Sequence, residues 1–186
     1  MTRWAPRKAD VLDALATEIL QQYSKGRVII AVDAQDPATA ESFASDLAAA
    51  IGRTSHAVFV AELSDFRLPR ATDGDYDYSL LQRMLIDPFR LSIGTGFNLA
   101  GFDAERDMPV EPRWSSGPKD AILILAGEQL QIAELRGQWN YSIWLDDGAT
   151  DPKSAYVKKA KPATSATAIV NVDDPEHPRR VFADSC

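Results

Sequence analysis

The sequence predicts an α/β fold in which a central parallel sheet of about five strands is flanked by helices. Short apolar runs recur along the chain and alternate with segments whose apolar residues repeat at helical spacing. Continuous apolar runs are typical of parallel sheets, because such sheets are covered on both faces. A chain of 186 residues without an internal repeat favours one core. We therefore expect a single domain over residues 1–186.

The two patterns place the elements along the chain. Strands are expected at residues 27–32, 57–63, 121–126, 141–145 and 168–172. Helices are expected at residues 9–23, 38–51, 78–86 and 128–138. The first helix has Val11, Leu15 and Ile19 on one face and ends before Gly26. Ligands on parallel sheets collect at the carboxyl ends of the strands, so the segments that follow the strands are the first place to look for a site.

Two segments are expected to lack long regular elements. Residues 89–116 are rich in glycine and proline, which favours an irregular excursion with a short hairpin. Residues 148–166 are polar and carry four lysines, which favours a solvated loop or a short helix over a binding patch.

Composition excludes several function classes. The formal net charge of −7 argues against nucleic acid and against an anionic membrane as partners. The single cysteine, Cys186, permits neither an intramolecular disulfide nor a cysteine metal cluster. Because the chain shows no membrane-spanning apolar run and no signal-peptide pattern, we expect a cytoplasmic protein.

The segment between the first strand and the next helix occupies the place of a phosphate loop, G-x-x-x-x-G-K-[ST]. In that loop backbone N–H groups cradle the phosphates, the lysine neutralises them, and the hydroxyl holds magnesium. Here the glycine positions are Ala34 and Thr39, the lysine position is Ala40, and the hydroxyl position is Glu41, followed by Ser42. Residues 33–42 therefore predict a degenerate phosphate loop in which Glu41 repels phosphate. An ordinary strand-to-helix turn is the alternative interpretation.

Six collinear segments carry a resemblance to a known family. They are VIIAVDAQDPATAESFASDLAAAI from Val28, ELSDFRLPR from Glu62, DYDYSLLQRMLIDP from Asp75, GFDAERDMPVEP from Gly101, AILILAGEQLQIAELRGQWNYSIWLD from Ala121, and AIVNVDDPEHPR from Ala168. Over nearly its whole length the chain resembles the uridine kinase family of P-loop kinases, particularly the actinobacterial type. The resemblance implies a three-layer P-loop NTPase-like fold around a central parallel sheet.

The chain departs from this family at its catalytic positions. The family's second-strand motif resembles D-D/S-F-Y, in which the first aspartate is the base and the tyrosine helps to hold the nucleobase. This chain has Ser64 and Arg67 there, with Asp65 between them. The family's acidic residue after the third strand is replaced by Ala126, and Glu128 follows shortly after. Asp65 and Glu128 are thus the candidate catalytic residues, neither of them assigned, and no metal ligand is expected.

The lid region is also shortened. Where the family has a long helical segment and an arginine-bearing lid, this chain has only residues 148–166. Lys158, Lys159 and Lys161 lie there, but lysine lacks the bidentate fork that arginine offers to phosphate, so we assign them no catalytic role.

The family's acceptor pocket maps onto several segments of this chain. The resemblance gives these acceptor-pocket candidates: Asp65, Arg67, Arg70, Asp77, Tyr78, Phe97 and Phe102. Alternatively, Arg67 and Arg70 are surface ion-pair partners of Asp73, Asp75 and Asp77, an interpretation that we favour.

Three functional hypotheses follow. The first is a catalytically inactive kinase-like protein, a pseudokinase that senses a small-molecule ligand or binds a protein partner or a second copy, without a cofactor. The second is an active kinase of a nucleoside or another small hydroxylated metabolite, which would need ATP and magnesium at an unconventional phosphate site. The third is a regulatory partner subunit of an active paralogue.

Overall fold

The computed structural model describes residues 6–70, 75–91, 94–103, 106–148, 151–152 and 154–182, so Cys186 lies outside the described residues. The helices are α1 Lys8–Gln22, α2 Pro37–Gly52, the 3-10 turn η1 Leu63–Phe66, α3 Tyr78–Leu81, the π-helical turn η2 Gln82–Ile86, α4 Asp87–Arg90, α5 Ala155–Ala160 and α6 Pro162–Ser165. The strands are β1 Val28–Ala34, β2 Val58–Glu62, β3 Phe97–Asn98, β4 Phe102–Asp103, β5 Met108–Pro109, β6 Trp114–Ser115, β7 Ile122–Gly127, β8 Tyr141–Asp146, β9 Ala168–Asn171 and β10 Arg179–Val181.

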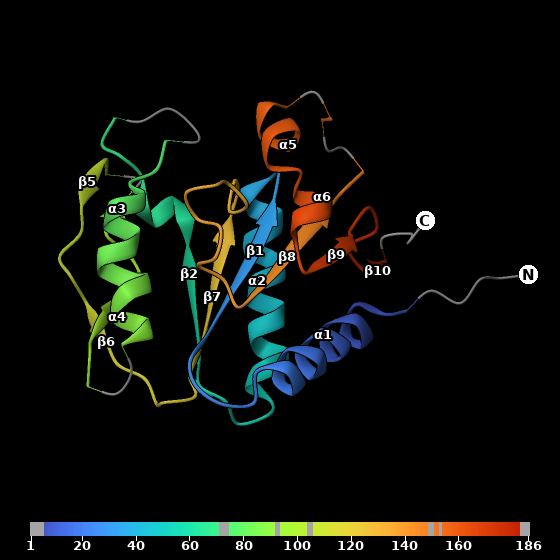
Figure 1. Cartoon of the computed structure of the whole chain (residues 1–186), viewed down its shortest axis with the longest axis horizontal. Helices are drawn as coiled ribbons and strands as arrows, with labels where there is room; N and C mark the ends of the chain where they lie inside the picture. Colours follow the sequence, from blue (N-terminus) through green and yellow to red (C-terminus); the bar gives the residue numbers. More distant parts are fainter. Residues whose placement is uncertain are drawn as a thin grey trace, which may run out of the picture.

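A six-stranded sheet with the order β10-β9-β8-β1-β7-β2 forms the centre of the molecule (Figure 1). The five strands β2, β7, β1, β8 and β9 are parallel, as predicted, and β10 adds an antiparallel edge. Asp33 of β1 is in register with Gly127 of β7 and with Trp144 of β8. The ends of these three strands are therefore level, and the segments that follow them meet at one edge of the sheet.

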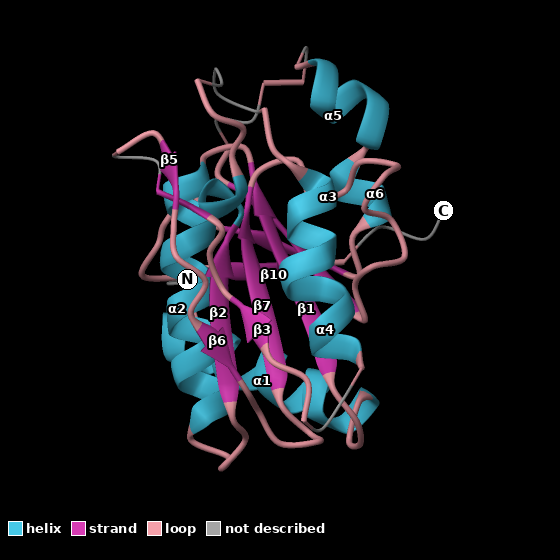
Figure 2. Ribbon diagram, turned by 90° about the vertical axis from the view of Figure 1, so that its left-hand side faces the viewer, coloured by secondary structure: helices cyan, strands magenta, loops and turns pink. Residues whose placement is uncertain are grey.

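Helices cover both faces of this sheet and give three layers (Figure 2). On one face α1 and α2 pack their apolar sides against the sheet, where Ile19, Leu47 and Ile51 are fully buried. On the other face η1 and the helical residues 78–90 bury Phe66, Leu81, Leu85 and Phe89. The expected helix at 78–86 therefore exists and continues to Arg90. Pro88 follows the π-helical turn, as fits a residue that cannot donate the usual helical bond.

The remaining segments agree with the sequence in part. The glycine-rich excursion contains two short antiparallel pairs, β3–β6 and β4–β5, and residues 148–166 contain the short helices α5 and α6. The helix predicted at 128–138 is wrong, because this segment forms irregular turns. Gln129 adopts a left-handed conformation with φ of 60°, which interrupts a helix, and the N–H of Leu130 bonds to the side chain of Asp33.

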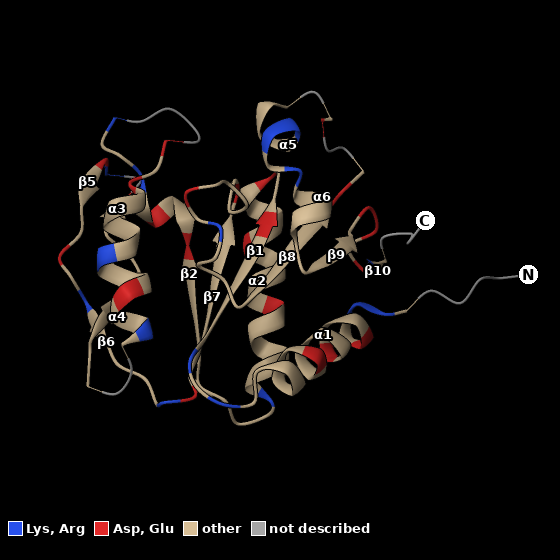
Figure 3. Cartoon of the chain, in the orientation of Figure 1, with Lys and Arg blue, Asp and Glu red and all other residues tan. Residues whose placement is uncertain are grey.

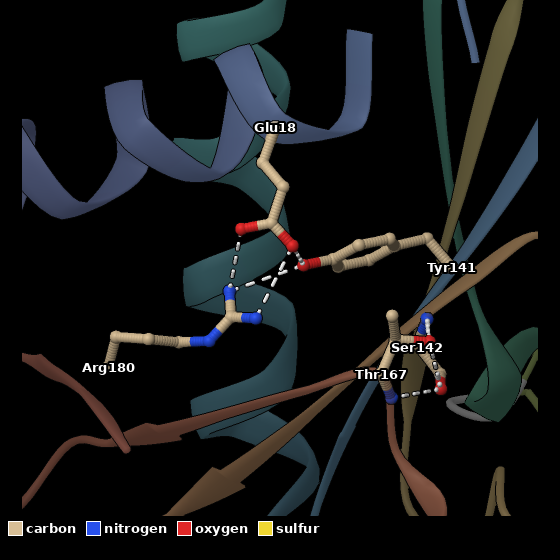
Figure 4. A network of polar contacts seen from close by, with 5 residues as sticks. All are labelled: Glu18, Tyr141, Ser142, Thr167 and Arg180. Atoms are coloured by element: carbon tan, nitrogen blue, oxygen red, sulfur yellow. Dashed lines mark hydrogen bonds and ion pairs between the residues drawn. The ribbon is translucent and has the colours of Figure 1, made fainter. Parts of the chain in front are cut away.

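A polar network ties the two ends of the chain to the sheet (Figure 4). The hydroxyl of Tyr141 on β8 donates to Glu18 Oε1 of α1 at 2.5 Å. Arg180 of β10 donates from Nη1 to Glu18 Oε2 at 3.3 Å and to the Tyr141 hydroxyl at 3.2 Å. Glu18 is the acceptor that holds both groups, so it anchors α1 and β10 together. No helix among the described residues is long and apolar enough to cross a membrane.

We expect Glu18→Ala to lower the free energy of unfolding by about 2 kcal/mol, because Tyr141 and Arg180 lose the charged acceptor that satisfies them. Asp13→Ala on the same helix is the matched control. The Asp13–Arg53 ion pair has both side chains 59% exposed, so its loss should cost only about 0.5 kcal/mol. Urea unfolding of the two variants measures the difference, and equal losses would contradict the anchoring role.

Candidate functional site

The connection from β1 to α2 lies at the carboxyl edge of the sheet, where a P-loop kinase would hold phosphate. Only two residues, Gln35 and Asp36, separate the end of β1 at Ala34 from the start of α2 at Pro37. The carboxylate of Asp36 caps α2, since it accepts hydrogen bonds from the N–H groups of Ala38 at 3.3 Å and Thr39 at 3.2 Å. Pro37 has no N–H to offer. The amides at this helix terminus are thus occupied by a carboxylate of the chain itself.

The residues aligned with the phosphate loop present no cation and no glycine turn at this edge. Ala34 is buried at the end of β1, and Ala40 lies on the buried face of α2 and is fully buried in the core. The hydroxyl of Thr39 donates to Asp36 Oδ2 at 2.8 Å. Glu41 is half-buried and Ser42 is exposed on α2. Burial raises the pKa of Glu41, and the charges of Glu62, Asp65 and Asp36 raise it further.

Asp33 is the polar centre of this edge, although it lies in a strand and is fully buried. Its Oδ1 accepts from the N–H of Leu130 at 3.3 Å, and its Oδ2 accepts from the hydroxyl of Tyr156 on α5. The Tyr156 hydroxyl also accepts from the N–H of Gln131 at 3.1 Å, so α5 is bonded directly over the end of β1. Burial raises the pKa of Asp33 to about 7, and the charge of Glu128 adds to the rise, while the bonds from Tyr156 and Leu130 oppose it.

The shortened lid segment makes a second contact with the same connection. The N–H of Asp151 donates to Gln35 Oε1 at 2.7 Å, and the ring of Tyr156 lies 6.2 Å from that of Trp144 on β8. Residues 149, 150 and 153 of this segment lie outside the described residues. Together the contacts from Asp151 and Tyr156 fix the segment on the β1–α2 connection.

Further carboxylates gather beside this connection at the ends of β1 and β2 (Figure 3). Asp65 lies in η1, directly after β2, and its carbonyl accepts from the N–H of Gly101 at 2.9 Å. Burial raises the pKa of Asp65 to about 6, and the charges of Glu62 and Asp103 contribute. The charge of Glu62 raises the pKa of both Glu41 and Asp65, so these three residues form one acidic cluster.

Glu128, the other candidate base, takes part in a separate network with tyrosines. The hydroxyl of Tyr76 donates to Glu128 Oε1 at 2.9 Å. Burial, with the charges of Glu134 and Glu128, raises the pKa of Tyr78 to about 12. Asp77 caps α3 through the N–H of Leu80 at 2.8 Å, so its carboxylate has a structural partner.

The other predicted pocket residues have positions that the sequence did not indicate. Phe97 is fully buried and packs edge-to-face against two other rings, with ring-centroid distances of 5.0 Å to Phe59 and 5.2 Å to Phe89. Phe102 is buried in β4. Arg67 forms an antiparallel bridge with Tyr76. Arg70 is exposed, and its N–H donates to Asp107 at 2.9 Å. Asp73, a predicted partner of both arginines, lies outside the described residues.

These residues do not fit a magnesium–nucleotide. A triphosphate requires converging N–H donors and a cation, whereas here a carboxylate occupies the N-terminus of α2 and an acidic cluster lies beside it. Within the described parts of the chain, no group of three acidic, histidine or cysteine side chains could hold a metal ion.

Sequence reasoning missed both Asp33 and Tyr156 as site residues. An aspartate at the end of an otherwise apolar strand is a usable signal, because aspartate is depleted in strands and buried carboxylates need partners. Tyr156 carries no such signal, since nothing in its local sequence indicates a contact with a residue 123 positions earlier.

We expect Asp33→Asn to flatten the pH dependence of stability. The pKa of Asp33 rises from 3.8 to about 7 on folding, so between these values the folded state binds more protons and the free energy of unfolding falls as the pH rises. In the parent chain the free energy of unfolding should fall by roughly 2–3 kcal/mol between about pH 5 and pH 8 because of this group, and in the variant, which cannot titrate there, this fall should be absent. Urea unfolding across this range tests the prediction. Tyr156→Phe removes a hydrogen bond that lowers the pKa of Asp33, so in this variant the fall in the free energy of unfolding should extend to higher pH. If the parent chain and both variants show the same pH dependence, Asp33 is not the titrating group.

Comparison with known proteins supports the fold. No protein-family model and no curated protein matches the chain. Among solved structures, the chain is similar to a possible uridine kinase from Bacillus stearothermophilus, with 18% identity and a TM-score of 0.70 over 86% of this chain and 97% of that one. It is also similar to a proposed fructose transport system kinase from Silicibacter sp. TM1040, with 19% identity and a TM-score of 0.60 over 83% and 91%. The mixed α/β architecture with its mostly parallel sheet is therefore a P-loop kinase fold.

Proposed function

We propose that this chain is a uridine kinase-like pseudokinase, which keeps the P-loop kinase fold for ligand sensing or protein interaction and does not transfer phosphate. The observation that carries the proposal is the capping of α2 by Asp36. Helix N-termini bind phosphate through free N–H groups and the helix dipole. A carboxylate already bonded to these groups competes with phosphate for the same donors and repels it.

The surroundings support the same proposal. Tyr156 and Leu130 bond to Asp33 directly over the end of β1. Glu41 and Asp65 place negative charge beside that point, where a kinase needs positive charge to stabilise the transferred phosphoryl group. The proposal requires neither ATP nor magnesium. Its partners would be a small molecule, another protein or a second copy in the cytoplasm, and not nucleic acid or membrane.

One observation favours an active kinase as the second candidate. A general base works best when its pKa is close to the operating pH, and the pKa of Asp65 is raised to about 6. Asp65 would then accept the proton of a hydroxyl on a nucleoside or another small metabolite, with Glu128 as the alternative base. This function needs a phosphate site built differently from a P-loop, together with ATP and magnesium.

Thermal unfolding with millimolar ATP and magnesium, with and without uridine or cytidine, tests the proposal. We expect no shift, whereas ATP at a hundred times its Kd would raise the midpoint by roughly 5–10 °C. Transfer of labelled γ-phosphate to either nucleoside should also be undetectable.

A magnesium-dependent shift with phosphoryl transfer would refute the pseudokinase and favour the active kinase. In that case Asp65→Asn or Glu128→Gln should abolish transfer, while the exposed Asp120→Asn should not. Co-purification with an active paralogue, without any ligand-induced shift, would assign the chain instead as a regulatory subunit.

A further inference from the structure

A polar cavity of about 370 Å³ lies away from the phosphate-loop region, beside the first half of β8. Its walls come from three segments: the turn after β7 with Gln131 and Arg136, the start of β8 with Trp139 and Ser142, and the end of α6 with Ser165 and Thr167. No acidic side chain among the described residues lines the cavity, although the chain carries a net charge of −7.

Gln131 contributes an unsatisfied donor to this wall. The residue is only 3% exposed, and its side-chain nitrogen Nε2 has no hydrogen-bond partner. A buried amide without a partner costs roughly 1–3 kcal/mol, so such groups are rare unless something else satisfies them. Gln131 is also one of the residues that line the cavity.

Arg136 contributes a positive charge that forms no ion pair with a carboxylate of the described residues. Its Nε donates to the carbonyl of Gln131 at 3.3 Å, and its Nη2 donates to the carbonyl of Ala160 at 2.8 Å and to Ser165 Oγ at 3.3 Å. All three acceptors are neutral, and among the described residues Nη1 has no partner. Arg136 is exposed, but these bonds hold its guanidinium in place and leave Nη1 as a donor for a ligand.

Ser142 and Thr167 contribute a further donor. The N–H of Thr167 donates to Ser142 Oγ at 3.1 Å, and the N–H of Ser142 donates to Thr167 Oγ1 at 3.2 Å (Figure 4). The two hydroxyl oxygens lie 3.4 Å apart, so at most one hydroxyl proton can bond to the other oxygen. The second hydroxyl proton is left to donate to an occupant of the cavity.

We propose that this cavity binds a small oxyanion, a carboxylate or a phosphate group. Gln131, Arg136 and the Ser142–Thr167 pair each leave a donor over, and the donor of Arg136 belongs to a positive charge that has no carboxylate partner among the described residues. An oxyanion is the ligand that supplies only acceptors together with negative charge. The indole of Trp139 forms an apolar part of the wall, which suits an organic acid or an organic phosphate.

The site goes beyond the proposed pseudokinase and does not depend on it. Residues of the site do, however, contact both ends of α5, the helix that covers the end of β1. The backbone N–H of Gln131 donates to the Tyr156 hydroxyl, and Arg136 bonds to the carbonyl of Ala160, the last residue of α5. An occupant would therefore stabilise the residues that hold α5 in place.

Calorimetric titration and thermal unfolding of the full chain test the site with three sodium salts. Phosphate and acetate are the two probes, and chloride at equal ionic strength is the reference. We expect saturable binding of at least one probe below about 20 mM, with a rise of the midpoint beyond that in chloride. The probe that shows saturable binding, phosphate or acetate, identifies the class of oxyanion that the cavity prefers.

Two variants assign binding to the cavity. Arg136→Gln should weaken binding by about tenfold to a hundredfold, because a hydrogen bond to a charged group is lost. Gln131→Leu should also weaken binding, yet leave the ligand-free midpoint unchanged or higher, because it removes an unsatisfied buried amide. This second variant separates a ligand site from a folding defect.

Arg90→Gln and Gln138→Leu are the matched controls, since both residues lie beside the same turn without lining the cavity. Both should bind the probe like the parent chain. The proposal is wrong if neither probe saturates beyond chloride, or if the controls lose binding as much as Arg136→Gln and Gln131→Leu. Neither result would alter the outcome with ATP, so this site and the pseudokinase proposal stand or fall separately.

Discussion

The carboxyl group of Asp33, fully buried at the end of the central strand, sets the constraint around which the carboxyl edge of the sheet is built. A buried carboxyl is costly unless hydrogen bonds satisfy it. Here the donors come from Leu130, which follows β7, and from Tyr156 of α5. The chain turns after β7, with Gln129 in a left-handed conformation, and this turn places the N–H of Leu130 against Asp33. Because Tyr156 must reach Asp33, α5 lies over the end of β1.

The same edge supports the proposal that this P-loop kinase fold lacks a phosphate site. A strand and a helix in the required orientation remain, but two residues join them where a longer, glycine-bearing loop would curl around an anion. The short connection brings Asp36 to the cap position, where it satisfies the first amides of α2 from within the chain. The N–H groups that a bound phosphate would need are therefore used in hydrogen bonds that stabilise the fold.

Local patterns predicted the parts of the fold that depend on local physics. Apolar runs located the five parallel strands, and helical spacing located α1 and α2, because burial of one face is the main force that forms such elements. Helical spacing failed at 128–138, where the chain turns at Gln129 and the amides of Leu130 and Gln131 bond to Asp33 and Tyr156, which are distant in sequence. For the same reason the sequence identified Asp65 and Glu128 as acidic candidates but could not place Asp33, Tyr156 or the orphan amide of Gln131. The aspartate in an apolar strand is a signal for Asp33, but the partners of all three residues arise from contacts between separate segments.

The position of α5 over the end of β1 would also lower the affinity of any nucleotide for this edge of the sheet. Helix α5 has six residues, too few to be stable alone, so its position depends on contacts with the rest of the chain. These contacts include the bonds from Tyr156 to Asp33, from Arg136 to Ala160 and from Asp151 to Gln35. Consider a form of the protein in which α5 has left β1 and these three bonds are broken. At about 1 kcal/mol each, the bonds would limit this open form to roughly one molecule in a hundred. A nucleotide that binds only this open form loses the same factor in affinity, before any repulsion from Asp36 and Glu41 is counted.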